Sequence, residues 1–379
     1  MPQSLRPFTI AIEDQALQDL EQRLTQTRWP EAETVDDWSQ GVPLASIKAL
    51  CNHWLHHYDW REFETRLNRY PQFLTEIDGL DIHFLHIRST HAEAMPMILT
   101  HGWPGSFAEF LNVIDPLVNP TAHGGSESDA FHLVIPSLPG YGFSGKPAKT
   151  GWGLERIAQA WITLMDRLGY DRYVAQGGDW GSGVTSKIGE IQPPQCMGIH
   201  LNMALAMPTE EDHANLSDRD KKALADVQYY FDHDSAYAMQ QKSRPQTLAY
   251  GLADSPVAQA AWIYEKFHSW TDNNGAPEDA LSVTAMLDNI SLYWLTNSGA
   301  SSARLYWESF SDMSGVEISL PTGISVFPRE IFRPARAWAE RKYHNIIHWG
   351  EPAKGGHFAA FEQPEIFVDE LRQCFASLR

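Results

Sequence analysis

The feature that most constrains the fold is a short glycine-rich stretch in the middle of the chain, VAQGGDWGS at residues 174–182. An apolar run that favours a strand ends in glycines, and the residues after it favour a helix. A strand, a tight turn and a helix around the pattern G-x-nucleophile-x-G form a nucleophile elbow, which usually carries serine at its centre. Here the centre is Asp179. The stretch therefore predicts a carboxylate nucleophile at the carboxyl end of a strand.

Strand-like and helix-like segments alternate on both sides of this elbow. The runs MPMILT (95–100), FHLVIP (131–136), YVAQ (173–176), TGISVFP (322–328) and NIIHWG (345–350) favour strands, and the intervening segments favour amphipathic helices. This alternation predicts an α/β fold with a mostly parallel, doubly wound sheet. Within residues 72–87, two alternating runs are joined by Asp78-Gly79, which predicts a hairpin before that sheet.

The domain organisation follows from where this alternation stops. Residues 205–310 are polar, helical in pattern and poor in strand-like runs, so we expect a helical lid inserted into a core made of residues 91–204 and 311–379. Residues 1–90 would wrap around that core as an N-terminal segment. A lid over the carboxyl ends of the strands predicts a pocket between lid and sheet, next to Asp179.

Composition excludes several classes of function. The net charge of -19 argues against nucleic-acid binding, because phosphates require basic patches. The start of the chain has no apolar run long enough for a membrane anchor or a signal peptide. The three cysteines, Cys51, Cys196 and Cys374, are scattered without metal-ligand spacing. We therefore expect a cytoplasmic protein without a metal or other cofactor, and a homodimer stays open.

Three loops at strand ends carry the chemical signal, in the order HGWPG (101–105), GGDWGS (177–182) and KGGHFAAFE (354–362). An α/β-hydrolase has an oxyanion loop, a nucleophile and a late histidine in this order. An aspartate nucleophile changes the reaction, because a carboxylate displaces a leaving group at an sp3 carbon and forms an alkyl ester. Water activated by a histidine can then hydrolyse that ester on the enzyme's own side chain.

A halide or the oxygen of a strained epoxide would suit this scheme as the leaving group. A halide requires N–H donors, whereas an epoxide oxygen requires an acid such as a tyrosine hydroxyl. The insertion offers several tyrosines, and spacing alone does not choose among them: 229, 230, 237, 250, 264, 293 and 306. The alternatives to an epoxide hydrolase are a haloalkane dehalogenase and a non-catalytic hydrolase-fold protein that only binds its ligand.

The chain resembles the microsomal-type epoxide hydrolases over nearly its whole length. The likeness rests on WREFETRLNRYPQF (60–73), HGWPGSFAEF (101–110), GGDWGS, LADSPVAQAAWIYEKF (252–267), SLYWLT (291–296) and GGHFAAFEQPE (355–365). It implies an apolar small-molecule epoxide as the substrate. By position, it also implies Asp179 as nucleophile, His357 as general base and Glu330 as the acid that orients the histidine. Tyr237 and Tyr306 would open the ring, and the backbone N–H groups of Trp103 and Trp180 would form the oxyanion hole.

Several neighbouring residues have a plainer interpretation. His101 is expected to shape its loop through local hydrogen bonds, and Ser144 and Ser182 to serve turns and helix starts. The acids Asp288, Glu308 and Glu351 also lie near predicted strand ends and compete with Glu330 from first principles. The lid tryptophans Trp262, Trp294 and Trp307 are expected to form core and pocket wall.

Overall fold

A computed structural model describes residues 5–310 and 316–379 of the 379-residue chain. In these residues a nine-stranded sheet runs in the order β1-β2-β3-β5-β4-β6-β7-β8-β9. Its strands are β1 (Arg6–Phe8), β2 (Gln72–Ile77), β3 (Leu80–Ile87), β4 (Met95–Thr100), β5 (Phe131–Pro136), β6 (Tyr173–Gly177), β7 (Cys196–Leu201), β8 (Thr322–Ser325) and β9 (Ile346–Gly350).

The prediction of a mostly parallel sheet is confirmed. Strands β4 to β9 pair in parallel, while β1, β2 and β3 extend the sheet with antiparallel pairing. The predicted hairpin is present as β2 and β3, with Asp78 and Gly79 at positive φ in its turn. Every residue of β5 and β6 is buried, which explains why these strands read as continuous apolar runs.

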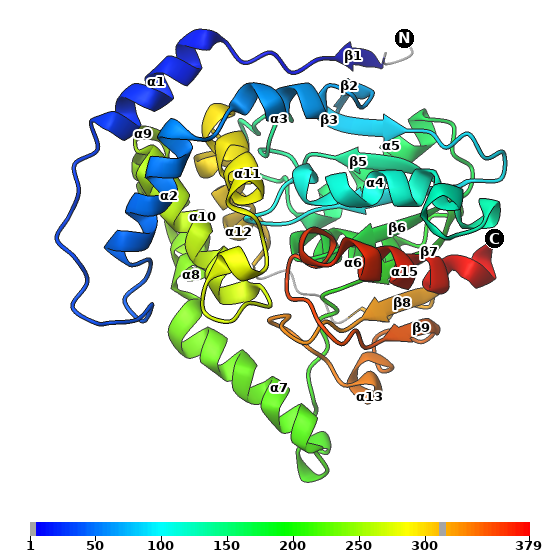
Figure 1. Cartoon of the computed structure of the whole chain (residues 1–379). Coiled ribbons are helices and arrows are strands. Elements are labelled where there is room, and N and C mark those ends of the chain that lie inside the picture. Colours follow the sequence, from blue (N-terminus) through cyan, green and yellow to red (C-terminus); the bar gives the residue numbers. More distant parts are fainter. Residues whose placement is uncertain (1–4, 311–315) are drawn as a thin grey trace.

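Helices cover both faces of the sheet (Figure 1). The helices around the core are α4 (Leu111–Val118), α5 (Leu154–Arg167), α6 (Trp180–Ile191), α13 (Arg336–Ala339), α14 (Ala359–Glu362) and α15 (Pro364–Phe375). The amphipathic α5 buries Ile157, Trp161, Leu164 and Met165 against the sheet side of the molecule. The predicted sheet flanked by helices is therefore an α/β-hydrolase fold.

Residues 205–310 are mainly helical. They form α7 (Asp218–Tyr229), a π-helical turn (Tyr230–Asp234), α8 (Ala236–Ser243), α9 (Pro245–Asp254), α10 (Pro256–Trp270), α11 (Val283–Leu295) and α12 (Gly299–Ser309). The N-terminal helices α1 (Asp14–Thr25), α2 (Leu44–His56) and α3 (Trp60–Leu67) lie outside the lid helices, and α1 and α2 contact α10 (Figure 1). The predicted start of the second core segment, at residue 311, lies outside the described residues.

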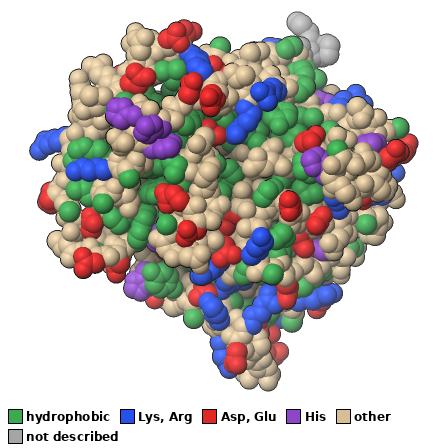
Figure 2. All heavy atoms as spheres, in the orientation of Figure 1, with side chains coloured by type: hydrophobic (Ala, Val, Ile, Leu, Met, Phe, Trp, Pro, Cys, Tyr) green, Lys and Arg blue, Asp and Glu red, His purple; other side chains and the backbone are tan. Residues whose placement is uncertain are grey.

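The surface agrees with the acidic composition. Figure 2 shows Lys and Arg side chains interspersed with Asp and Glu on the face drawn, without a broad basic area. Within the described residues, no helix is long and apolar enough to cross a bilayer. The three cysteines are buried and free in the part of the chain that the structure covers.

One expectation about the lid is wrong. Trp262 and Trp294 are partly buried and pack against the main core cluster, as expected. Trp307 is 52% exposed on α12, so it is neither core nor pocket wall. Its neighbour Tyr306 is 2% exposed. The helix turns the two adjacent residues to different sides, and burial of Tyr306 leaves Trp307 facing outward.

Candidate active site

Asp179 lies in a strained turn between β6 and α6. Its φ of 49° lies in the left-handed region, which residues other than glycine rarely adopt. The backbone around this turn is closely packed. A methyl group on Gly181 would lie 1.9 Å from the carbonyl oxygen of Thr100, and one on Gly177 would lie 2.0 Å from the carbonyl oxygen of Gly181. The two outer glycines of the elbow therefore let α6 approach β4 and β6 closely, and the turn projects Asp179 from the sheet edge.

The loop after β4 holds the carboxylate of Asp179 from one side. The backbone N–H of Trp103 donates to Asp179 Oδ1 over 2.8 Å. A methyl group on Gly102 would lie 2.2 Å from the same oxygen, so glycine is required for this approach. Trp180 is the first residue of α6, directly after Asp179, where free helix N–H groups favour negative charge.

His357 completes the line of charged groups. Its Nε2 lies 3.3 Å from Asp179 Oδ2, and its Nδ1 lies 2.7 Å from Glu330 Oε1. Both His357 and Glu330 are almost fully buried. The competing acids lie elsewhere: Asp288 binds Arg66 and Tyr58, Glu308 accepts from the Gly151 amide, and Glu351 pairs with Arg219.

Burial by itself lowers the pKa of His357. The negative charge of Glu330, together with the hydrogen bonds of Asp179 and Glu330, outweighs burial and raises the pKa well above its ordinary value. The two carboxylates beside the imidazole therefore favour its protonated form. Loss of the charge on Asp179 would remove one of the two contributions that keep it protonated.

The loop that carries His357 is fixed by a second buried acid, Glu362 in α14. Its Oε2 accepts hydrogen bonds from the amides of Asp272 (2.7 Å) and Gly356 (3.1 Å), and its Oε1 accepts one from Phe358 (3.0 Å). Burial raises the pKa of Glu362 to about 7. Its carboxyl thus holds the residues on either side of His357.

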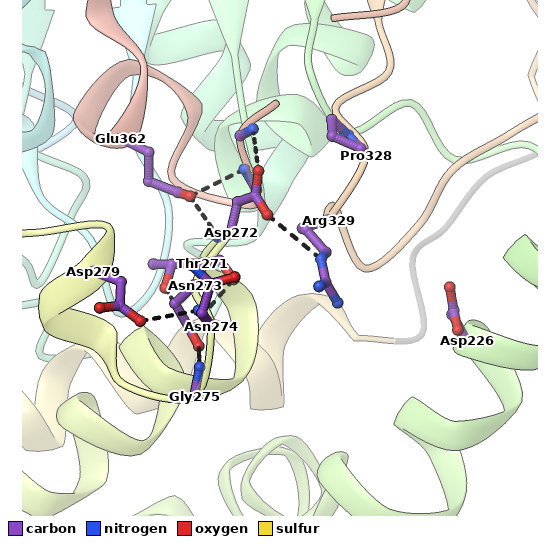
Figure 3. A network of polar contacts seen from close by, with 12 residues as sticks. Asp226, Thr271, Asp272, Asn273, Asn274, Gly275, Asp279, Pro328, Arg329 and Glu362 are labelled. Atoms are coloured by element: carbon purple, nitrogen blue, oxygen red, sulfur yellow. Dashed lines mark hydrogen bonds and ion pairs between the residues drawn. The ribbon is translucent and has the colours of Figure 1, made fainter. Parts of the chain in front are cut away.

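Asp272 extends this support toward Glu330. Its Oδ2 accepts from the amide of Gly355, and its Oδ1 lies 3.5 Å from Nε of Arg329, the residue before Glu330. Figure 3 shows Asp272 between Glu362 and Arg329 in this network. The histidine loop and the loop of Glu330 are therefore tied to each other through the end of α10 and the residues that follow it.

Tyr237 and Tyr306 come from lid helices α8 and α12 and meet over Asp179. The ring of Tyr237 stacks on Trp103 at 4.9 Å, and the ring of Tyr306 meets the edge of Trp180 at 4.7 Å. Burial raises the pKa of both hydroxyls well above the ordinary value, although a hydrogen bond with Tyr237 opposes the rise for Tyr306. Both hydroxyls therefore stay protonated and can act as hydrogen-bond donors.

Four of the predicted site residues line one pocket, and Trp103 and His357 reach it through their contacts with Asp179. A cavity of ≈ 620 Å³ lies between lid and sheet. Its inner wall includes Asp179, Trp180, Tyr237 and Tyr306, and Arg341 and Glu317 lie at its exposed end. Most other lining residues are apolar, such as Leu154, Met203, Leu205, Phe310, Ile331 and Phe332. The arrangement suits an apolar molecule whose reactive end reaches the carboxylate.

The neighbours of the site behave as expected. His101 is buried, with its Nδ1 at 2.9 Å from its neighbour's carbonyl oxygen and its Nε2 accepting from the amide of Leu138. The hydroxyl of Ser182 donates to the carbonyl of Gly177, and that of Ser144 to the carbonyl of Ser137. None of the clusters of His, Cys, Asp and Glu in the described ranges has the arrangement of a metal site.

Comparison with known proteins identifies the family. The profile of the epoxide hydrolase N terminus matches residues 5–110, and that of the alpha/beta hydrolase fold matches residues 95–246. A protein of Stigmatella aurantiaca called "Putative epoxide hydrolase" is 57% identical over 99% of this chain and 86% of its own length. The chain belongs to the microsomal-type epoxide hydrolase family.

More distant relatives agree with this assignment. Epoxide hydrolase 1 of Sus scrofa is 34% identical over 99% of this chain and 89% of its own length. The structure of Aspergillus niger epoxide hydrolase superposes with a TM-score of 0.90 at 35% identity, covering 99% of this chain and 97% of that one. The chain is thus an epoxide hydrolase, and the prediction of the enzyme class is confirmed.

Sequence reasoning missed several residues that shape the site. Glu362 is part of the motif GGHFAAFE, five residues after His357, and its spacing to the histidine was a usable signal. Glu109, in HGWPGSFAEF, lines a small cavity that also contacts Asp179 and His357. Tyr230 was one of seven lid tyrosines without a distinguishing signal, because its contact with Tyr237 depends on a local change of helix type.

Proposed function

We propose that the enzyme hydrolyses apolar epoxides through a covalent ester on Asp179. Oδ2 of Asp179 attacks an epoxide carbon while Trp103 holds Oδ1. The carbon–oxygen bond of the ring breaks, and the epoxide oxygen takes a proton from a lid tyrosine, Tyr237 or Tyr306. The product of this step is a hydroxyalkyl ester whose carbonyl oxygen is the former Oδ1. The observation that supports the proposal is the convergence of both hydroxyls and the carboxylate in one apolar pocket.

Esterification then prepares the base. It removes the charge on Asp179 that helps to raise the pKa of His357. The imidazolium can therefore release its proton and replace the one lost by the tyrosine, directly or through water. Neutral His357, held by Glu330, next takes a proton from a water molecule, and the resulting hydroxide attacks the ester carbonyl carbon.

The second step regenerates the enzyme. Charge that develops on the former Oδ1 is stabilised by the amide of Trp103 and, in this proposal, by that of Trp180 at the start of α6. The tetrahedral intermediate collapses, and the departing alkoxide takes the proton from His357. The vicinal diol leaves, Asp179 gives its carboxyl proton to His357, and the ion pair is restored.

His357→Gln tests this order of events. The variant should still be alkylated but should hydrolyse its ester slowly, because the proton acceptor for water is missing. Intact-mass measurement after adding styrene oxide should show one adduct, and peptide mapping should locate it on Asp179. Full turnover without an adduct would contradict the proposal.

Two controls complete this experiment. Asp179→Ala should form neither adduct nor diol. In wild-type enzyme, a single turnover in ¹⁸O-labelled water should place the label in Asp179 and not in the first diol. Offering 1-bromobutane beside styrene oxide measures bromide against diol release. Rapid bromide release without diol would favour the dehalogenase alternative, for which the buried Trp180 indole N–H, unpartnered in the described structure, would be a halide donor.

A further inference from the structure

A third tyrosine, Tyr230, lies beside Tyr237 and lines the same cavity. Its hydroxyl oxygen is 3.0 Å from that of Tyr237, and both side chains are buried. We propose that Tyr230 is a positioning residue: it donates a hydrogen bond to Tyr237 and thereby directs the hydroxyl hydrogen of Tyr237 toward the epoxide oxygen. This inference rests on the function proposed above for Tyr237.

A local change of helix type brings Tyr230 to this position. The α-helix α7 ends at Tyr229, and residues Tyr230–Asp234 form a π-helical turn before α8 begins at Ala236. Such turns are rare in proteins and are often found at functional sites. Here Tyr229, the last residue before the turn, is exposed, and Tyr230, its first residue, is buried. The turn is followed by α8, the helix that carries Tyr237.

The last residue of the turn anchors it to the rest of the lid. Asp234 Oδ1 lies 2.5 Å from Nζ of Lys266, and its Oδ2 accepts from the indole N–H of Trp270 over 2.6 Å. Lys266 is 2% exposed and is also paired with Glu265. A buried cation that lost these partners would be costly. The C-terminal end of the turn that carries Tyr230 is therefore fixed to α10.

The ring of Tyr237 is held on both faces. Nζ of Lys266 lies 4.5 Å from its centroid, Trp103 stacks on it at 4.9 Å, and Trp270 meets it at 5.2 Å with an interplanar angle of 63°. A ring enclosed in this way has little freedom to reorient. The remaining freedom of Tyr237 is rotation about its carbon–oxygen bond, which decides where the hydroxyl hydrogen points.

The hydrogen count then assigns the donor. A tyrosine hydroxyl has one hydrogen to donate and can also accept. If Tyr237 donates its hydroxyl hydrogen to the epoxide oxygen, the hydrogen bond between the two tyrosine hydroxyls must be donated by Tyr230. Burial raises the pKa of Tyr230, so this hydroxyl keeps its hydrogen. As Tyr237 transfers its proton and becomes a phenolate, the donated bond strengthens, because hydrogen bonds to charged acceptors are stronger than neutral ones.

Tyr230→Phe removes this donor and little else. We expect ring opening, measured as the single-turnover rate of ester formation, to slow by about tenfold or more. Hydrolysis of the ester should keep its rate, because Tyr230 is not part of that step. The matched control is Tyr229→Phe, one residue earlier and 64% exposed, which should change neither rate.

A double-mutant cycle separates a positioning role from a structural one. In a Tyr237→Phe background, Tyr230→Phe should have no further effect on ring opening, whereas in a Tyr306→Phe background its factor should persist. Equal factors in both backgrounds, or equal slowing of both half-reactions, would overturn the inference. A ring-opening rate unchanged by Tyr230→Phe would overturn it while leaving the proposed function intact. A rate unchanged by Tyr237→Phe would instead refute the donor role proposed for Tyr237, on which this inference rests.

Discussion

The two sides of the active site are built by different means. On the sheet side, Asp179, His357 and Glu330 are placed by backbone: a strained turn, close-packed glycines and amide hydrogen bonds. On the lid side, Tyr237 and Tyr306 are placed by side chains, through aromatic contacts and a hydroxyl pair. The sheet side carries the groups proposed to act in both chemical steps, and the lid side carries the proton donors proposed for the first step.

The two tryptophans of the oxyanion loop and the elbow join these sides. The amide of Trp103 binds the carboxylate of Asp179 while its ring stacks on Tyr237, and Trp180 follows Asp179 while its ring makes a T-shaped contact with Tyr306. Each tryptophan therefore links the proposed nucleophile to one proposed proton donor.

The largest expected effect comes from removing the lid's chemistry altogether. Tyr237→Phe/Tyr306→Phe should lower the ring-opening rate by about 10³-fold or more, since general acid catalysis typically contributes 10²–10⁴-fold. Intact mass should show no adduct, in contrast to the His357 variant. Tyr250→Phe, at a lid tyrosine that is 70% exposed, is the matched control. Accumulation of adduct in the double variant would show that ring opening does not need the lid tyrosines, and would contradict the separate roles proposed for the two sides.

A smaller effect is expected from the support of the histidine loop. Glu362→Gln replaces one carboxylate oxygen with an NH₂ group, which cannot accept a hydrogen bond. The variant therefore loses the hydrogen bonds from the amides of Asp272 and Gly356, or the one from the amide of Phe358. We expect ester hydrolysis to slow by about tenfold while ring opening keeps its rate, because the loop positions His357. Single-turnover kinetics of both steps measure this.

The control for that variant is Glu365→Gln, an exposed acid in the first turn of α15. It should leave both rates unchanged. Equal slowing of ring opening and hydrolysis by Glu362→Gln would mean that the acid supports the whole site and not the histidine in particular.

The last effect concerns stability and not rate. Burial raises the pKa of Glu109 to about 8, with His357 opposing the rise and Asp179 adding to it. The unfolded carboxyl ionises near pH 4.3. Between these two pH values the folded state therefore binds more protons than the unfolded state. The contribution of Glu109 to the free energy of unfolding is complete below about pH 4 and is lost as the pH rises through 8. Glu109→Gln should remove this loss.

Denaturant unfolding at several pH values measures the difference. The unfolding free energy of the wild type should fall relative to Glu109→Gln by on the order of 3 kcal/mol between pH 5 and pH 8. The exposed Glu93 provides the control, because Glu93→Gln should follow the wild-type curve. Parallel curves for wild type and Glu109→Gln would show that this carboxyl is ionised in the folded protein.

Much of this protein could be predicted from the chain alone. The elbow around Asp179, the order of the three loops and the alternation of strands and helices specify the fold, because they depend on local backbone preferences and on burial patterns within single segments. The candidates His357 and Glu330 followed from their positions after predicted strands and from the family likeness. The domain boundaries and the catalytic roles stay predictions.

Tertiary structure decided what depends on contacts between distant segments. The sequence could not choose Glu330 over Asp288 by its own chemistry, because the choice is a 2.7 Å contact with a residue 27 positions away. Nor could it show that Tyr306 is buried while Trp307 is exposed, or that a π-helical turn brings Tyr230 to Tyr237. Such pairings arise from how helices pack against each other, and this packing is a property of the whole fold and not of any one segment.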